Sequence, residues 1–181
     1  KTIFLVTGTH LIKKYGYSIN EIIKDKLKID EIISINLNKI STSENISCLS
    51  GEYLKQFSKY YKKINPDYLV LLGDRYEILS AAISAYIMNI PIIHIAGGEI
   101  TEGSYDDGFR HSITKLSHLH LTSNPDSLRR IIKMGEEKWR CLNVGYSPLY
   151  FLNKKTINLD RLIKNLDLNI KKPLILFTLH P

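Results

Sequence analysis

Three short segments in the middle of the chain bring together side chains that can transfer protons and bind anions. They are residues 73–77, 94–99 and 106–111, which lie at successive ends of apolar runs. Carboxylates and imidazoles serve as general acids and bases, and an arginine binds anionic groups. Packing alone does not explain so many charged groups in so short a stretch. The pattern indicates chemistry on an anionic, sugar-like substrate.

Asp74 ends one of these apolar runs and directly precedes an expected helix. Its carboxylate can cap that helix by accepting backbone amides, or it can act as a catalytic or orienting acid, and the two roles are compatible. Arg75 and Glu77 fall in the first turn, where solvent exposure or local pairing is expected. The pair Gly97–Gly98 indicates either a tight turn or a close approach of the backbone to another group.

Four carboxylates crowd the connection that follows the glycine pair, those of Glu99, Glu102, Asp106 and Asp107. One of the two aspartates is expected to cap the next helix. Asp106 and Arg110 are four residues apart, a spacing that brings opposite charges together on one helix face. This pair is either a surface salt bridge or a charged pair at the edge of a cleft.

The six histidines differ in their positions. Five lie in or at the ends of expected strands, whereas His111 lies in a helix beside Arg110. His94 and His118 are expected to be hydrogen-bonded residues of the core or the cleft edge. His180 is better placed for chemistry, because it follows an apolar run and imidazole changes its charge near neutral pH. Neither a metal site nor a cofactor is expected.

The composition is typical of one globular domain. The chain has 181 residues, 44% of them hydrophobic and 24% charged, and no apolar run reaches the roughly 18 residues that span a bilayer. The net charge of +7 would suit nucleic acid, but the lysines are spread over helix-like segments and no nucleic-acid-binding motif is present. Two widely separated cysteines favour a reducing, cytoplasmic location. No nucleic-acid or membrane partner is expected.

Short apolar runs alternate with longer amphipathic ones along the chain. The expected strands are residues 3–6, 31–35, 68–72, 92–95, 118–122, 141–144 and 174–178, and the expected helices are residues 19–28, 51–64, 76–88, 106–117, 126–134 and 159–166. Residues 36–50 are polar, and a loop is expected there. The alternation predicts an α/β fold with a doubly wound, mostly parallel, Rossmann-like sheet. Because such sheets bind ligands at the carboxyl ends of their strands, the charged segments are expected to gather at one edge.

A set of short motifs runs through the chain in a fixed order. They are residues 6–11, 15–16, 73–77, 89–91, 94–99, 101–103, 106–107, 110–115 and 180–181. Together they resemble the hydrolysing UDP-N-acetylglucosamine 2-epimerases over essentially the whole chain. The resemblance implies one half of a two-domain, glycosyltransferase-B-like fold. It also implies a reaction of nonulosonic acid biosynthesis, in which a base removes the C2 proton while UDP leaves C1, and water adds to the glycal to give a free 2-epimer such as N-acetylmannosamine.

The resemblance further implies functional residues. Those expected to act in catalysis are Asp74, Glu99, Glu102, Asp106, Arg110 and His180. Those expected to bind the substrate are His10, Arg75, His94, Gly97, Gly98 and His111. The chain departs from many family members at Ala96, where they have a glutamate, so Glu99 or Glu102 is hypothesised to supply that carboxylate. This departure leaves two substrates open, UDP-N-acetylglucosamine and UDP-2,4-diacetamido-trideoxyhexose.

The resemblance also bears on domain organisation. Residues 1–181 are expected to form a single N-terminal Rossmann-like domain that lacks its first strand and a second, UDP-binding domain. Such a segment is expected to be inactive by itself, and the full-length protein is expected to be a homo-oligomer. Two alternative functions remain, another nucleotide-sugar enzyme of the same fold and a non-catalytic nucleotide-sugar binding module.

Overall fold

The computed structural model describes residues 1–35, 42–146, 148, 159–167 and 177. The chain divides into two compact units, Lys1–Gly145 and Tyr146–Pro181. In the second unit, the described residues include the short helix α7 (Leu159–Asn165). The strand expected at residues 174–178 lies outside the described residues except for Phe177, which belongs to no regular element.

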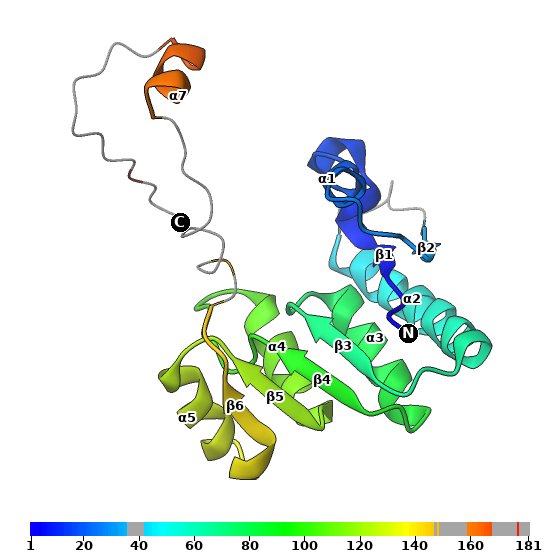
Figure 1. Ribbon diagram of the computed structural model, residues 1–181. Helices are drawn as coiled ribbons and strands as arrows, with labels where there is room; N and C mark the ends of the chain where they lie inside the picture. Colours follow the sequence, from blue (N-terminus) through cyan, green and yellow to red (C-terminus); the bar gives the residue numbers. More distant parts are fainter. Residues whose placement is uncertain (36–41, 147, 149–158, 168–176, 178–181) are drawn as a thin grey trace. The chain divides into compact units, whose positions relative to one another are not determined.

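Short parallel strands form the sheets of the first unit. In the described residues they are β1 (Leu5–Thr7), β2 (Glu31–Ile33), β3 (Leu69–Leu72), β4 (Ile92–Ile95), β5 (Leu119–Thr122) and β6 (Cys141–Asn143). β1 pairs with β2, while β3, β4, β5 and β6 pair in that order, and every pairing is parallel. Helices connect successive strands (Figure 1), so the structure confirms the predicted α/β, Rossmann-like fold.

The helices of the first unit cover the strands. They are α1 (Ile19–Lys24), α2 (Ser43–Ile64), α3 (Tyr76–Ile87), α4 (Tyr105–Leu116) and α5 (Pro125–Lys133), with short 3-10 turns η1 (Gly8–Leu11), η2 (Lys13–Tyr15) and η3 (Lys138–Arg140). α3 and α4 pack on β3 and β4, whereas α5 packs on β5 and β6 (Figure 1). Among the described helices, none is both long and apolar enough to cross a membrane.

Helix α2 corrects the loop prediction for residues 36–50, because the helix begins at Ser43. Thr42 caps it, accepting a backbone N–H of the first turn at 3.2 Å. Ile46 and Leu49 pack against the core at helical spacing. This apolar face outweighs the loop preference of the serines and asparagines around it, and residues 36–41 lie outside the described part.

One hydrophobic core includes residues of both sheets. Ile33 of β2 and Leu71 of β3 belong to the same buried cluster, and the aromatic side chains of α2 lie within it. The rings of Tyr53 and Phe57 stack with centroids 6.1 Å apart, and Tyr61 follows 5.8 Å from Phe57. Stacked aromatic rings bury large apolar surfaces, so α2 contributes much of the stability of this unit.

Within the described residues, the two sheets are not hydrogen-bonded to each other, although both contribute to this core. β3 is therefore an edge strand, and 57% of Val70 and 65% of Leu72 are exposed on it. An apolar strand edge with unpaired backbone groups readily pairs with another strand. The edge of β3 is thus suited to accept one more strand.

Candidate functional site

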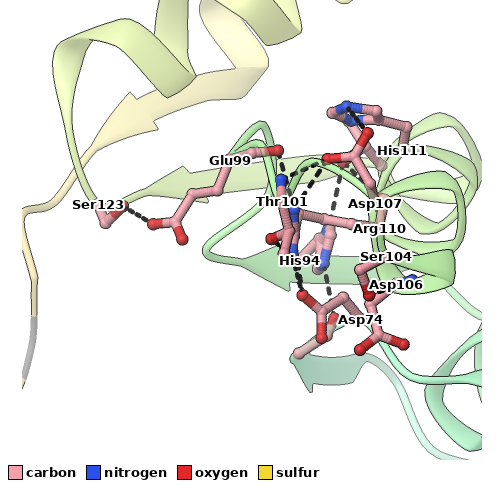
Figure 2. Close-up of polar contacts among 12 residues, drawn as sticks. Asp74, His94, Glu99, Thr101, Ser104, Asp106, Asp107, Arg110, His111 and Ser123 are labelled. Atoms are coloured by element: carbon pink, nitrogen blue, oxygen red, sulfur yellow. Dashed lines mark hydrogen bonds and ion pairs between the residues drawn. The ribbon is translucent and has the colours of Figure 1, made fainter. Parts of the chain in front are cut away.

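Arg110 of α4 lies at the centre of a polar cluster (Figure 2). It is buried, and its Nε donates to Asp74 Oδ2 at 2.9 Å, while Nη2 contacts the same oxygen. Nη2 also donates to Thr101 Oγ1 at 2.9 Å, and Nη1 donates to the Glu99 carbonyl at 3.0 Å and to Asp107 Oδ1 at 3.3 Å. These are five contacts with four acceptor atoms, and a guanidinium has five N–H donors. Arg110 therefore holds protein groups in place rather than offering itself to a ligand.

Three strand ends meet at this cluster. Asp74 follows β3, Glu99 and Thr101 lie in the loop after β4, and Ser123 follows β5. The Ser123 hydroxyl donates to the Glu99 carboxylate, which Figure 2 shows directed toward Ser123 and away from Asp74. The prediction that the charged segments gather at one edge of the sheet is confirmed for these three strands.

The Asp74 carboxylate is oriented by Arg110 rather than by the next helix. Arg75 occupies the cap position of α3, and no side chain caps that helix, so the capping role considered for Asp74 is wrong. Both Arg110 contacts fall on Oδ2, and 26% of the Asp74 side chain is exposed. A carboxylate held through one oxygen and partly open to solvent can exchange a proton with a bound substrate.

Ser104 caps α4, its hydroxyl accepting the N–H of Asp106 at 3.2 Å. The prediction that Asp106 or Asp107 caps this helix is therefore wrong. Asp107 reaches back across the loop instead, and its Oδ1 accepts the N–H of Thr101 at 2.8 Å. The loop after β4 is thus tied to the first turn of α4.

The predicted ion pair between Asp106 and Arg110 is replaced by two others. Arg110 pairs with Asp107, three residues earlier, and with Asp74 from β3. Asp107 Oδ2 also lies 3.5 Å from His111 Nε2, so His111 joins the cluster through Asp107. Residues three apart on a helix are neighbours just as residues four apart are, and the long-range partner could not be read from spacing.

His94 is completely buried beneath the loop after β4. Its Nε2 lies 3.2 Å from the Gly73 carbonyl and its Nδ1 lies 3.2 Å from Thr114 Oγ1. Because a carbonyl only accepts, Nε2 carries the proton. Burial lowers the pKa of His94 to about 4. The core hydrogen bonding expected of His94 is confirmed, but its expected substrate contact is corrected, since no part of the side chain reaches the surface.

The low pKa of His94 predicts a pH-dependent stability. An unfolded chain binds this proton at the ordinary pKa of 6.5, whereas the folded protein binds it only near 4. The contribution of neutral His94 to the free energy of unfolding is therefore complete above pH 6.5 and is lost as the pH falls toward 4. At about 1.4 kcal/mol per pKa unit, the loss reaches about 3 kcal/mol. Urea denaturation at about pH 7 and about pH 5 measures it. A His94→Gln variant should lose this part of the pH slope, and an unchanged slope would contradict the assignment.

The glycine pair after β4 allows a close approach of the backbone. A Cβ at Gly97 would lie 2.8 Å from His94 Nδ1, and one at Gly98 would lie 2.5 Å from the Ser127 carbonyl of α5. Gly98 also has a φ of +80°, which glycine adopts without strain. The close approach expected of this pair is confirmed as packing against the protein, and its contact with substrate stays a prediction.

Gly98→Ala should lower the free energy of unfolding by about 2–4 kcal/mol, the sum of left-handed backbone strain and overpacking. Gly103 offers a matched control, because its φ is +75° and nothing lies within 4 Å of an added Cβ. Gly103→Ala should therefore lower the free energy of unfolding by the backbone strain alone. Urea denaturation of both variants separates the terms, and equal losses would show that the approach to Ser127 is unimportant.

The position that lacks the family glutamate lies in a turn. Ala96 has a φ of +61°, and its N–H donates to the Leu121 carbonyl at 2.8 Å. Glu102 is exposed in the same loop, and Glu99 contacts Ser123 as described. The hypothesis that Glu99 or Glu102 replaces the family glutamate stays a prediction.

Two other predicted residues, His10 and Arg75, lie outside the Arg110 cluster. His10 on η1 forms a hydrogen bond with Ser18, its Nδ1 lying 2.7 Å from the serine Oγ. Arg75 Nε lies 2.9 Å from Glu77 Oε1, which confirms the local pairing, but Glu77 is buried rather than exposed to solvent. His180 lies outside the described residues.

His118 and His120 have separate structural partners. His118 Nδ1 accepts the N–H of Ile92 at 3.2 Å, as expected for a hydrogen-bonded histidine. The buried His120 places Nε2 3.2 Å from Glu136 Oε2. Within the described ranges, no group of three or more histidine, cysteine or acidic residues could hold a metal ion.

Sequence reasoning missed the roles of four residues in the cluster, Thr101, Ser104, Asp107 and Ser123. Ser104 precedes Asp107 by three residues, and this resembles the spacing of a capping box, which could have identified the cap. Thr101 contacts Arg110, nine positions later, and Ser123 contacts Glu99, 24 positions earlier. No local spacing indicated these two contacts.

The family model described as UDP-N-acetylglucosamine 2-epimerase matches residues 1–181, the whole chain. The chain belongs to this family. In this member of the 2-epimerase family, the Arg110 cluster lies where strands β3, β4 and β5 end.

Two curated relatives cover nearly all of this epimerase-family chain. It is 39% identical over 186 residues to the Campylobacter jejuni protein named GDP/UDP-N,N'-diacetylbacillosamine 2-epimerase (hydrolyzing), with 98% of this chain and 46% of that protein aligned. It is 37% identical over 177 residues to the Legionella pneumophila protein named UDP-N,N'-diacetylbacillosamine 2-epimerase (hydrolyzing), with 97% and 46% aligned. The chain thus spans about half the length of these relatives.

Solved structures show the same fold. The UDP-GlcNAc 2-epimerase of Neisseria meningitidis, determined with UDP-GlcNAc bound, superimposes with a TM-score of 0.71 at 16% identity, covering 91% of this chain and 46% of that one. The UDP-N-acetylglucosamine 2-epimerase of Rickettsia bellii gives a TM-score of 0.70 at 22% identity, covering 92% and 44%. The family assignment and the fold therefore agree.

Proposed function

We propose that this chain is part of a hydrolysing UDP-sugar 2-epimerase. The observation that carries the proposal is the Asp74 carboxylate, fixed by Arg110 at the end of β3 beside the acidic first turn of α4. The membership of the whole chain in the 2-epimerase family supports it. A binder of an anion would gain little from so many carboxylates, whereas carboxylates can serve as the general acids and bases that transfer protons at a sugar carbon.

The proposed reaction has two stages. In the first, a carboxylate takes the proton from C2, the C1–O bond breaks, and its electrons leave with UDP, so that a C1–C2 double bond forms. In the second, water adds its oxygen to C1, and C2 is protonated on the opposite face. The sum is one UDP-sugar and one water converted to a free 2-epimer and UDP. Asp74 and Asp106 are the proposed proton-transfer groups, with Glu99 or Glu102 as a further acid and His180 as a further contributor.

Arg110 has a different role in this proposal. Because its donors are engaged by Asp74, Asp107 and the loop after β4, it acts as a positioning residue for the acids. The buried His94 packs against Gly97 of the same loop and forms hydrogen bonds with Thr114 of α4 and the Gly73 carbonyl. The remaining predicted substrate contacts, at His10, Arg75 and His111 and at the Gly97–Gly98 backbone, are part of the proposal.

We propose a UDP-2,4-diacetamido-trideoxyhexose as the substrate, with UDP-N-acetylglucosamine as the second candidate. The two relatives that are 39% and 37% identical are named for N,N'-diacetylbacillosamine, a sugar of the first kind. The Neisseria meningitidis relative named UDP-N-acetylglucosamine 2-epimerase is 32% identical over 153 residues. A role in nonulosonic acid synthesis agrees with the Escherichia coli relative named Polysialic acid biosynthesis protein P7, which is 42% identical over 140 residues.

The same proposal covers domain organisation. The edge of β3 is unpaired in the part of the chain that the structure describes, and with its exposed apolar side chains it suits a further parallel strand between the two sheets. We propose that the complete protein supplies this strand and a second domain that holds the nucleotide, and that residues 1–181 alone have little or no activity. Homo-oligomerisation and a cytoplasmic location are further parts of the proposal.

The test uses the complete protein that contains this chain, incubated in D₂O with each of the two UDP-sugars. NMR follows the release of UDP and the uptake of deuterium at C2. The expected result is a free 2-epimer that carries deuterium at C2. Formation of a new glycoside would indicate a glycosyltransferase instead, and binding without turnover would indicate a nucleotide-sugar binding module.

A further inference from the structure

The peptide bond that leads into Asp74 accepts a hydrogen bond from His94. The carbonyl of Gly73 lies 3.2 Å from His94 Nε2, and Asp74 is the next residue. This carbonyl and the N–H of Asp74 belong to one planar peptide unit, so the two groups are oriented together. The His94 ring therefore orients the backbone at the residue that is proposed to transfer a proton.

The other ring nitrogen of His94 connects the same ring to α4. Nδ1 lies 3.2 Å from Thr114 Oγ1, and that oxygen lies 3.0 Å from the carbonyl of Arg110, one helical turn earlier. Arg110 in turn donates to the Asp74 carboxylate. His94 is thus linked to the backbone on both sides of the ion pair between Asp74 and Arg110.

The hydrogen-bond donors of this network define the state of His94. A carbonyl only accepts, so Nε2 carries a proton, and in a neutral ring Nδ1 is then an acceptor. The hydroxyl of Thr114 is placed to donate to it. A second proton on His94 would make Nδ1 a donor, and the Thr114 hydroxyl would have to turn to the Arg110 carbonyl instead. The Thr114 hydroxyl therefore suits the neutral ring with its proton on Nε2.

The surroundings of His94 also favour the neutral ring. Burial is the main reason why the pKa of His94 is low, and the charges of His120 and Arg110 lower it further. His120 lies beside His94 because the two residues pair in register between β4 and β5. The Gly73 carbonyl and the charge of Asp74 act in the opposite direction, but they do not outweigh burial.

The loop after β4 lies directly on the hydrogen bond between His94 and Thr114. A Cβ at Gly97 would lie 2.8 Å from His94 Nδ1 and 2.9 Å from Thr114 Oγ1. Glycine allows the backbone to come this close. Packing alone does not explain an imidazole here, because an apolar side chain would avoid the free-energy cost of burying polar atoms. The polar atoms of His94 gain a purpose from the groups they orient.

We propose that His94 and Thr114 are positioning residues for Asp74. The Thr114 hydroxyl holds His94 as the neutral tautomer with its proton on Nε2, and this N–H fixes the peptide unit that leads into Asp74. Both side chains are completely buried, so they act through Asp74 rather than on the substrate. The proposal rests on the proposed function, since it requires Asp74 to transfer a proton.

Kinetics of the complete protein test the positioning role. Thr114→Val removes the hydroxyl and keeps a branched side chain. It should lower kcat by about tenfold to a hundredfold and leave KM and UDP affinity nearly unchanged, because misplacing a reacting group impairs turnover. Thr114→Ser returns the hydroxyl and should recover most of kcat. If Thr114→Val does not fold, Thr114→Ala takes its place beside Thr114→Ser.

Ser117→Ala is the matched control on the same helix. Ser117 is also buried, and its hydroxyl donates to the Ile113 carbonyl at 2.7 Å, near the end of α4. This variant loses a buried hydroxyl that does not contact His94, so kcat should stay at the parent value. Equal kcat in Thr114→Val and Ser117→Ala would overturn the positioning role, and so would equal losses in Thr114→Val and Thr114→Ser.

Nitrogen NMR of the complete protein labelled at its histidines gives a readout that does not require turnover. Near neutral pH, His94 should carry its proton on Nε2, and Thr114→Val should shift the Nδ1 resonance toward that of a free acceptor. A proton on Nδ1 in the parent protein would overturn the positioning role while leaving the proposed function standing. A parent protein that turns over neither UDP-sugar would overturn the proposed function and the role of His94 in it, whereas the tautomer would still be decided by NMR.

Discussion

Arg110→Ala is expected to lower the free energy of unfolding by about 3–5 kcal/mol, the cost of removing one partner from a buried ion pair. The substitution removes the donors that hold Asp74, Asp107, Thr101 and the Glu99 carbonyl. The loop after β4 would keep only the Asp107 contact with the Thr101 N–H as its attachment to α4, and turnover by the complete protein should fall below detection. Urea denaturation and UDP release measure the two effects.

Two further variants make the Arg110 prediction specific. Arg110→Lys should recover little stability, because a single ammonium cannot reproduce the planar fork of a guanidinium. Arg129→Ala is the matched control, since Arg129 pairs with Asp126 at the surface of α5 with 66% of its side chain exposed. Arg129→Ala should change the free energy of unfolding by no more than about 0.5 kcal/mol. If Arg110→Ala and Arg129→Ala lower the free energy of unfolding equally, the structural role assigned to Arg110 is wrong.

Asp74→Asn should lower turnover of the complete protein by about 10²–10⁴-fold, the usual contribution of a general acid or base. The amide keeps the size of the side chain and one oxygen acceptor for Arg110, so UDP affinity should change little. Asp126→Asn on α5 removes a carboxylate from an exposed ion pair and serves as the control. Turnover close to that of the parent protein would exclude Asp74 as a proton-transfer group.

Much of the fold could be predicted because apolar runs and amphipathic segments repeat in a fixed order. Strand β3 is continuously apolar and β4 is apolar except for His94, so the positions of these strands could be predicted from the sequence. The start of α2 was not, because serines and asparagines around Ser43 suggest a loop. There, the packing of Ile46 and Leu49 decided the structure, and packing is not a local property.

The sequence could predict which residues gather at the site, but not which of them contact each other. The gathering of Asp74 and Arg110 at one edge follows from the direction of parallel strands. Their direct ion pair joins residues 36 positions apart, which no helical spacing reveals. His94 shows the opposite problem, because a histidine at a strand end is compatible with both a cleft and a core. His94 lies on the face of the sheet that α4 covers, where Thr114 of this helix is its hydrogen-bond partner.

The surplus of carboxylates at the strand ends also has an electrostatic consequence for how a substrate approaches. Arg110 is engaged by Asp74 and Asp107, so its charge is compensated internally, while Glu102 and Asp106 add negative charge to the same surface. A negative surface repels a diphosphate but not a neutral sugar ring. A UDP-sugar arriving here is expected to turn its ring toward the acids and its diphosphate away from them. Long-range repulsion would then select the orientation before any specific contact forms.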